Sequence, residues 1–122
     1  MLWSTRFQFH RFGIGRYWAS DYGNVDDPSD FDFMRPLSPL HNVAESPKHN
    51  PMLITTADHD DRVSPLHSFK LAAELQHKGQ PALLRVEKKA GHGAGKPTSK
   101  IIDEAVDKWC WASHVVGATV KA

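Results

Sequence analysis

Two side chains in this sequence could form an acid–base pair, Asp60 and His92. Asp60 lies in the segment TADHDDRV (residues 56–63), and His92 lies in AGHGAGKP (residues 90–97). In serine acyl transfer, a carboxylate fixes the tautomer of an imidazole and stabilises its protonated form while the imidazole takes the proton of the serine hydroxyl. The two side chains therefore indicate serine acyl-transfer chemistry, with Asp60 as the acid and His92 as the base.

The spacing of these residues leaves two questions open. Asp58, Asp60 and Asp61 are all candidates for the acid, and aspartate is also a common turn former. Glycines at 91 and 93 let the chain bend around His92, but the same glycines would surround an ordinary surface histidine in a flexible loop. Spacing alone does not choose between these interpretations.

The elements that would position the pair are two strands and two helices. The apolar run 52–57 predicts a strand buried on both faces, and 82–87 predicts a second strand. Between them, Ser64 is expected to cap a helix that starts at Pro65 and ends at Gly79. Thr98 or Ser99 is expected to cap the last helix. Right-handed crossovers would make the strands parallel neighbours with the helices packed on the sheet, and both loops would leave the same sheet edge.

The first half of the chain gives weaker signals. No regular element is predicted over residues 1–23, and Pro28 suits the first turn of a short helix that reaches Met34. Pro36 and Pro39 predict an extended path over residues 37–40, followed by a polar loop over 41–51.

The order of acid and base predicts the fold class. A nucleophile, then Asp or Glu, then His is the chain order of α/β-hydrolases. None of the serines lies in G-x-S-x-G, the nucleophile elbow of that fold. We therefore expect an α/β architecture, the C-terminal portion of an α/β-hydrolase fold without its nucleophile-elbow half.

Composition excludes several function classes. The 122 residues carry a net charge of +1, which disfavours nucleic acid as a partner, and no apolar run is long enough to span a membrane. Cys110 is the single cysteine, so no internal disulfide can form, and a cytoplasmic location is expected. The histidines form no H-x-x-x-H or Cys/His pattern, so we expect no metal and no cofactor.

Several motifs resemble the C-terminal end of prolyl oligopeptidases. They are YWASDYG (17–23), SPLHNV (38–43), HDDRVSPLHS (59–68) and KAGHGAGKPT (89–98). The resemblance runs from about residue 9 to the last helix. It divides the chain into an unmatched segment over 1–8 and a partial peptidase catalytic domain over 9–122. The family's β-propeller and its nucleophile would lie before residue 1.

The resemblance implies a role for six residues. Asp60 resembles the acid and His92 the base of the family's triad, which settles the choice among the three aspartates. Arg62 resembles the arginine that binds a substrate carbonyl, a task that suits a guanidinium fork. Trp18 resembles the tryptophan that stacks on the substrate proline, and Tyr22 and Val63 resemble further pocket walls.

The implied function is a serine endopeptidase that cuts short peptides after proline. Because the serine is missing, we expect the 122 residues to be inactive alone, with the missing N-terminal half of the enzyme as a partner. One alternative is an esterase or dipeptidyl peptidase of the same fold. Another is a non-catalytic remnant or binding module. Without the resemblance, Trp18 and Tyr22 would be read as core aromatics and Arg62 as a solvated charge.

Overall fold

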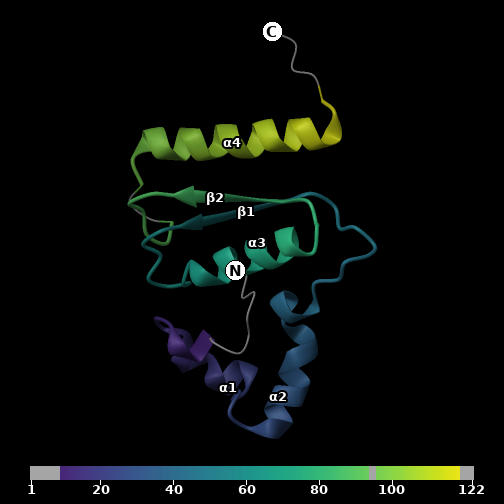
Figure 1. Cartoon of the computed structure of the whole chain (residues 1–122). Helices are drawn as coiled ribbons and strands as arrows, with labels where there is room; N and C mark the ends of the chain where they lie inside the picture. Colours follow the sequence, from purple (N-terminus) through teal and green to yellow (C-terminus); the bar gives the residue numbers. More distant parts are fainter. Residues whose placement is uncertain (1–8, 94–95, 119–122) are drawn as a thin grey trace. The chain divides into compact units, whose positions relative to one another are not determined.

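The computed structural model describes residues 9–93 and 96–118 (Figure 1). The chain forms two compact units, one up to His92 and one from Gly93 onward, and each is described by itself. The first unit contains a two-stranded sheet, the helix α3 and a series of short helices. The second unit contains the helix α4.

The sheet consists of β1 (Met52–Ala57) and β2 (Ala82–Glu87), with the bounds that the sequence predicts. The strands are parallel, and the register pairs Met52 with Ala82 and Ala57 with Glu87. Beyond the last pair, the Asp58 amide donates to the Glu87 carbonyl at 3.0 Å. The loops that follow the two strands therefore leave the sheet side by side, as Figure 1 shows.

Within the first unit, each face of β1 carries a buried residue, Ile54 on one face and Ala57 on the other, and burial of the whole strand on both faces stays a prediction. Ile54 is buried, whereas the adjacent Thr55, on the opposite face, is exposed. Successive side chains of a strand point to opposite faces, so Thr55 and Ala57 share one face and Ile54 lies on the other. The apolar run predicted the strand and its bounds but not how fully each face is covered.

The helix α3 (Leu66–His77) supplies the covered face of the sheet. Leu71, Ala72 and Leu75 pack with Ile54 to form the buried core of this unit. The expected cap at Ser64 is wrong. Pro65 precedes the first turn, no side chain caps it, and Ser64 instead accepts a hydrogen bond from the His67 amide through its backbone carbonyl. Gly79 has φ +66° and ends the helical path as predicted.

The N-terminal half is more helical than expected. Residues 9–22, where no element was predicted, form 3-10 helices η1 (Phe9–Arg11) and η2 (Gly15–Trp18) and the short helix α1 (Ala19–Tyr22). The helix α2 (Pro28–Met34) is confirmed, and the Asp27 side chain caps it by accepting from the Ser29 amide at 2.9 Å.

The extended path expected over residues 37–40 is also wrong. The chain forms 3-10 helices η3 (Arg35–Leu37) and η4 (Pro39–Asn42), joined by the extended residue Ser38. A proline in a first helical turn costs no hydrogen bond, because its missing N–H would have no partner there. Two prolines in two separate first turns therefore suit short helices.

The helix α4 (Thr98–Val116) dominates the second unit. Pro97 precedes it and no side chain caps it, so the expected cap at Thr98 or Ser99 is wrong. Its first turns are held by Glu104, which forms ion pairs with Lys96 and Lys108. In the part of the chain that the structure describes, neither this helix nor any other has the length and apolar character needed to cross a membrane.

Leu75 should contribute most strongly to the core under the sheet. It is 2% exposed, whereas Leu83 on β2 is 57% exposed. We expect Leu75→Ala to lower the free energy of unfolding by about 2–5 kcal/mol because it leaves a cavity. Leu83→Ala should change it by only about 0.5 kcal/mol. Urea unfolding of both variants measures the difference, and equal losses would show that α3 does not pack as described.

Candidate active site

The loop after β1 is a tight turn organised around the Asp60 carboxylate. Oδ1 of Asp60 accepts hydrogen bonds from the backbone amides of Arg62 and Val63, at 3.0 and 2.8 Å. The side chain of Asp60 is only 11% exposed. Backbone donors two and three residues ahead of an aspartate are typical of a local turn, and here they fix the direction in which the carboxylate points.

His92 meets this carboxylate from the loop after β2. Its Nδ1 atom lies 2.8 Å from Oδ2 and 3.0 Å from Oδ1 of Asp60. The histidine side chain is 37% exposed, so the contact is at the surface of the unit. Two residues that are 32 positions apart in the sequence are therefore brought into hydrogen-bond contact by the parallel pairing of the strands.

This geometry assigns different tasks to the two ring nitrogens. An ionised carboxylate can only accept a hydrogen bond, so Nδ1 of His92 carries the proton that faces Asp60. Nε2 is then the nitrogen with a lone pair, and it is the one that could take a proton from a hydroxyl. The arrangement has the acid–base geometry of a catalytic triad, and the roles of Asp60 and His92 in catalysis stay predictions.

The neighbouring aspartates are in different surroundings. Asp58 Oδ1 lies 2.6 Å from Nδ1 of His59 and 3.3 Å from the Ala90 amide. Hydrogen bonds from the His59 ring, and then from the backbone of Lys89 and Ala90, hold the pKa of Asp58 well below its usual range. Asp61 is exposed. Of the three, Asp60 is the one whose carboxylate faces His92.

The four residues expected to bind substrate fall into two groups. Arg62 is exposed and Val63 is half-buried, and both belong to the turn around Asp60. Trp18 ends η2 and is half-buried. Tyr22 ends α1 and packs edge to face on Phe9, with ring centroids 5.9 Å apart. The substrate-binding roles of all four stay predictions.

Two contacts bring the segment that carries Trp18 to the acid loop, residues 58–65 between β1 and α3, and to the first turn of α3. Phe12 packs edge to face on the ring of His67 near the start of α3, with ring centroids 6.1 Å apart. Gly13 has φ +53°, and a Cβ atom at this position would lie 2.5 Å from the Asp61 carbonyl oxygen. Only a glycine fits this close approach of two backbones in a left-handed conformation. Sequence reasoning did not single out Gly13.

A serine–histidine hydrogen bond does occur elsewhere, and it is not a nucleophile–base pair. Ser38 Oγ lies 2.8 Å from Nδ1 of His41. Ser38 is fully buried, however, and the two residues are joined within one short helical turn. A nucleophile must reach a substrate carbonyl, so this contact is read as structural.

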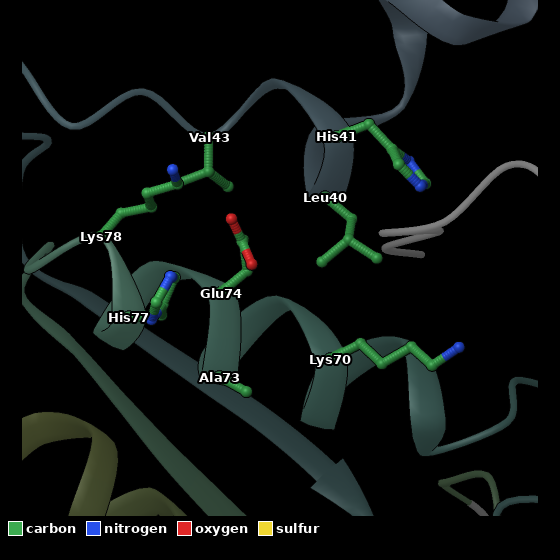
Figure 2. A pocket seen from close by; sticks show the side chains of 8 residues that line it. All are labelled: Leu40, His41, Val43, Lys70, Ala73, Glu74, His77 and Lys78. Carbon is green, nitrogen blue, oxygen red and sulfur yellow. The ribbon is translucent and has the colours of Figure 1, made fainter.

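A groove on the first unit lies away from Asp60 and His92. It has a volume of about 630 Å³ and runs between η4 and α3 (Figure 2). Figure 2 shows Leu40 pointing from η4 toward α3, with Lys70 and Glu74 on the helix side. Neither Asp60 nor His92 lines it, so the candidate site rests on the geometry of that pair and not on the size of a hollow.

No metal centre is apparent among residues 9–93 and 96–118. Within these residues, no three histidine, cysteine or acidic side chains are gathered in a way that could hold a metal ion.

The comparisons with known proteins agree on one family. A model of the prolyl oligopeptidase family matches residues 1–119. The chain belongs to the prolyl oligopeptidase family. The matched range includes residues 1–8, which were expected to be unmatched and which lie outside the described residues. The division of the chain at residue 8 stays a prediction.

Relatives in this family are similar to the chain over almost its whole length. It is 56% identical over 118 residues to prolyl oligopeptidase A of Galerina marginata (strain CBS 339.88), covering 93% of this chain and 16% of that protein. It is 44% identical over 115 residues to the prolyl endopeptidase of Dictyostelium discoideum, covering 89% and 15%. The chain thus spans about a sixth of the length of these prolyl oligopeptidase relatives.

Solved structures confirm the expected fold class. Prolyl oligopeptidase B from Galerina marginata, bound to a 35mer hydrolysis and macrocyclization substrate, matches with a TM-score of 0.84 and 42% identity. The match covers 95% of this chain and 17% of that one. The parallel strands and helices described above are therefore a portion of the α/β-hydrolase domain of prolyl oligopeptidases.

Gly13 provides a test of how the N-terminal segment meets the acid loop. We expect Gly13→Ala to lower the free energy of unfolding by about 2–3 kcal/mol or more, because it adds a backbone clash to left-handed strain. Gly79→Ala is the matched control. Gly79 also has positive φ, but its Cβ would meet only the flexible end of Lys48, so a loss of about 1 kcal/mol is expected. Equal losses in urea unfolding would contradict the close approach at Gly13.

Proposed function

We propose that the chain is part of a serine endopeptidase that hydrolyses peptide bonds after proline in short peptides, with Asp60 as the acid and His92 as the base. The observation that carries the proposal is the contact between Nδ1 of His92 and the Asp60 carboxylate at 2.8 Å. It lies where the two parallel strands end, the edge at which the sites of open α/β sheets form. Membership of the prolyl oligopeptidase family supports the same reaction class.

In this mechanism, Asp60 keeps the imidazole of His92 in the tautomer with the proton on Nδ1. Nε2 removes the proton of a serine hydroxyl as that oxygen attacks the scissile carbonyl. The resulting imidazolium is stabilised by Asp60, and it returns the proton to the departing amine. The 122 residues contain no G-x-S-x-G, so the proposal places the serine and the oxyanion donors outside them. The chain alone is then inactive.

The proposed substrate pocket uses Trp18, Tyr22, Arg62 and Val63. A flat indole face suits the rigid ring of a substrate proline, and apolar walls exclude water from it. Arg62 follows Asp60 by two residues, so a guanidinium fork next to the acid could hold a substrate carbonyl beside the cleaved bond. The proposal includes a cytoplasmic location, which the single cysteine supports.

A chimeric enzyme tests the catalytic pair. In it, this chain replaces the matching 118 residues of prolyl oligopeptidase A from Galerina marginata, which are 56% identical to it. We expect the chimera to cleave a fluorogenic peptide after proline, and the isolated chain to show no serine-dependent turnover. Asp60→Asn should lower kcat by about 10⁴-fold, because the amide stabilises the wrong tautomer of His92.

Asp61→Asn is the matched control for the chimera, since it removes the same charge from the next residue. It should leave kcat within a few-fold of the parent. An Asp60→Asn chimera as active as the parent would refute the assignment. A folded chimera with no turnover at all would favour a non-catalytic binding module.

Trp18 provides a test of substrate class. In the active chimera, we expect Trp18→Ala to lower the preference for proline over alanine before the cleaved bond by about tenfold, because a ring stack of about 1–1.5 kcal/mol is lost. Trp109→Ala, at a tryptophan that is 73% exposed on α4, should leave the preference unchanged. A parent chimera that cleaves after alanine and proline equally well would indicate a different hydrolase of the same fold.

A further inference from the structure

Asp58 connects the loop of the acid to the loop of the base. It follows β1 directly, and its Oδ1 atom accepts a hydrogen bond from the Ala90 amide, in the loop after β2, at 3.3 Å. Two backbone contacts join the same loops. The Asp58 amide donates to the Glu87 carbonyl at 3.0 Å, and the His59 amide donates to the Ala90 carbonyl at 3.1 Å. The Asp58 carboxylate is thus the side-chain part of a junction between the two loops.

The turn that meets this carboxylate has an unfavourable backbone conformation. Lys89 has φ +52°, the left-handed region that residues with a side chain rarely adopt. The amide of Ala90, the residue directly after Lys89, donates a hydrogen bond to the Asp58 carboxylate. A side-chain carboxylate that accepts from a backbone amide is one way to hold such a turn. The His59 ring, and after it the backbone of Lys89 and Ala90, lowers the pKa of Asp58, so the carboxylate stays ionised.

Packing holds only part of this turn, because Ala90 is buried but Lys89 is exposed. A hollow of about 290 Å³ lies beside it, lined by His59, Lys89, Ala90 and Gly91. A strained backbone next to open space can relax, because no side chains fill the space that it would enter. Polar contacts with the acid loop therefore add to the packing of Ala90 in holding this turn.

We propose that Asp58 is a positioning residue that sets the distance between Asp60 and His92. Asp60 comes two residues after Asp58, and His92 comes two residues after Ala90, so the junction lies two residues from each member of the pair. Holding Ala90 against Asp58 fixes the loop that presents the imidazole to the Asp60 carboxylate. Asp58 itself contacts His59 and backbone, and not the imidazole of His92. The inference rests on the proposed roles of Asp60 and His92.

The tautomer of His92 is the appropriate measurement, because it reports the contact with Asp60 and requires no turnover. In the full 122-residue chain, ¹⁵N NMR at alkaline pH, where histidine rings are neutral, gives the fraction of the ring that is protonated on Nδ1. His92→Gln assigns the signal. We expect mostly the Nδ1–H form in the parent, and a fall to the minority level of an unconstrained imidazole in Asp58→Ala.

Three further variants separate position from charge. Asp58→Asn keeps an acceptor for the Ala90 amide without the charge, so it should retain the Nδ1–H form. Asp61→Asn, which removes a charge nearby, should retain it as well. Asp58→Glu keeps the charge but moves the acceptor by one methylene, so it should lose much of the Nδ1–H form. If Asp58→Ala does not fold, the Asp58→Glu variant decides whether Asp58 positions His92.

The outcomes are distinct. Retention of the Nδ1–H form in Asp58→Glu, or in a folded Asp58→Ala variant, would overturn the positioning role. A loss in Asp58→Asn as large as in Asp58→Ala would show that charge, and not the acceptor, controls the tautomer, and would overturn it too. An inactive chimera with the expected tautomers would count against the proposed peptidase function alone.

Discussion

The parallel pairing of β1 and β2 is the constraint on which the rest of the site depends. Ala57 pairs with Glu87, so the two strands end together and their loops start from neighbouring points. Asp60 and His92 follow three and five residues later, within reach of each other across the gap between parallel strands. A shift of one residue in this register would turn every side chain of one strand to the other face and separate the pair.

The strands and the long helices could be predicted because their signals are local. The run over 52–57 is apolar and β-branched between polar segments, and the apolar residues Phe69, Ala72 and Leu75 recur at a helical spacing. The predictions of a cap at Ser64 and at Thr98 or Ser99 are wrong. A residue type that is able to cap a helix does not always form the capping hydrogen bond. At Ser64, the backbone carbonyl makes the contact instead of the hydroxyl. The 3-10 helices at Pro36 and Pro39 were missed because proline suits both an extended path and a first helical turn.

The sequence predicted which loops carry the site, but not which side-chain atoms meet. A carboxylate and an imidazole after consecutive predicted strands indicated a shared sheet edge. The residues alone could not choose among Asp58, Asp60 and Asp61, because the choice depends on where each side chain points. In the structure, two backbone amides orient Asp60. The need for glycine at position 13 gives no local signal in the sequence, because it arises from the backbone of Asp61, 48 residues further along the chain.

Asp58 and Asp60 have different tasks in one short loop. If the acid alone joined the two loops, motion of the histidine loop would change the very distance that proton transfer requires. A separate polar junction at Asp58 removes that dependence, because the loop is held two residues away from the reacting groups. Loops position functional groups well only when a supporting layer of contacts limits their freedom. The acid–base geometry can then form within this unit, independently of the element that carries the nucleophile.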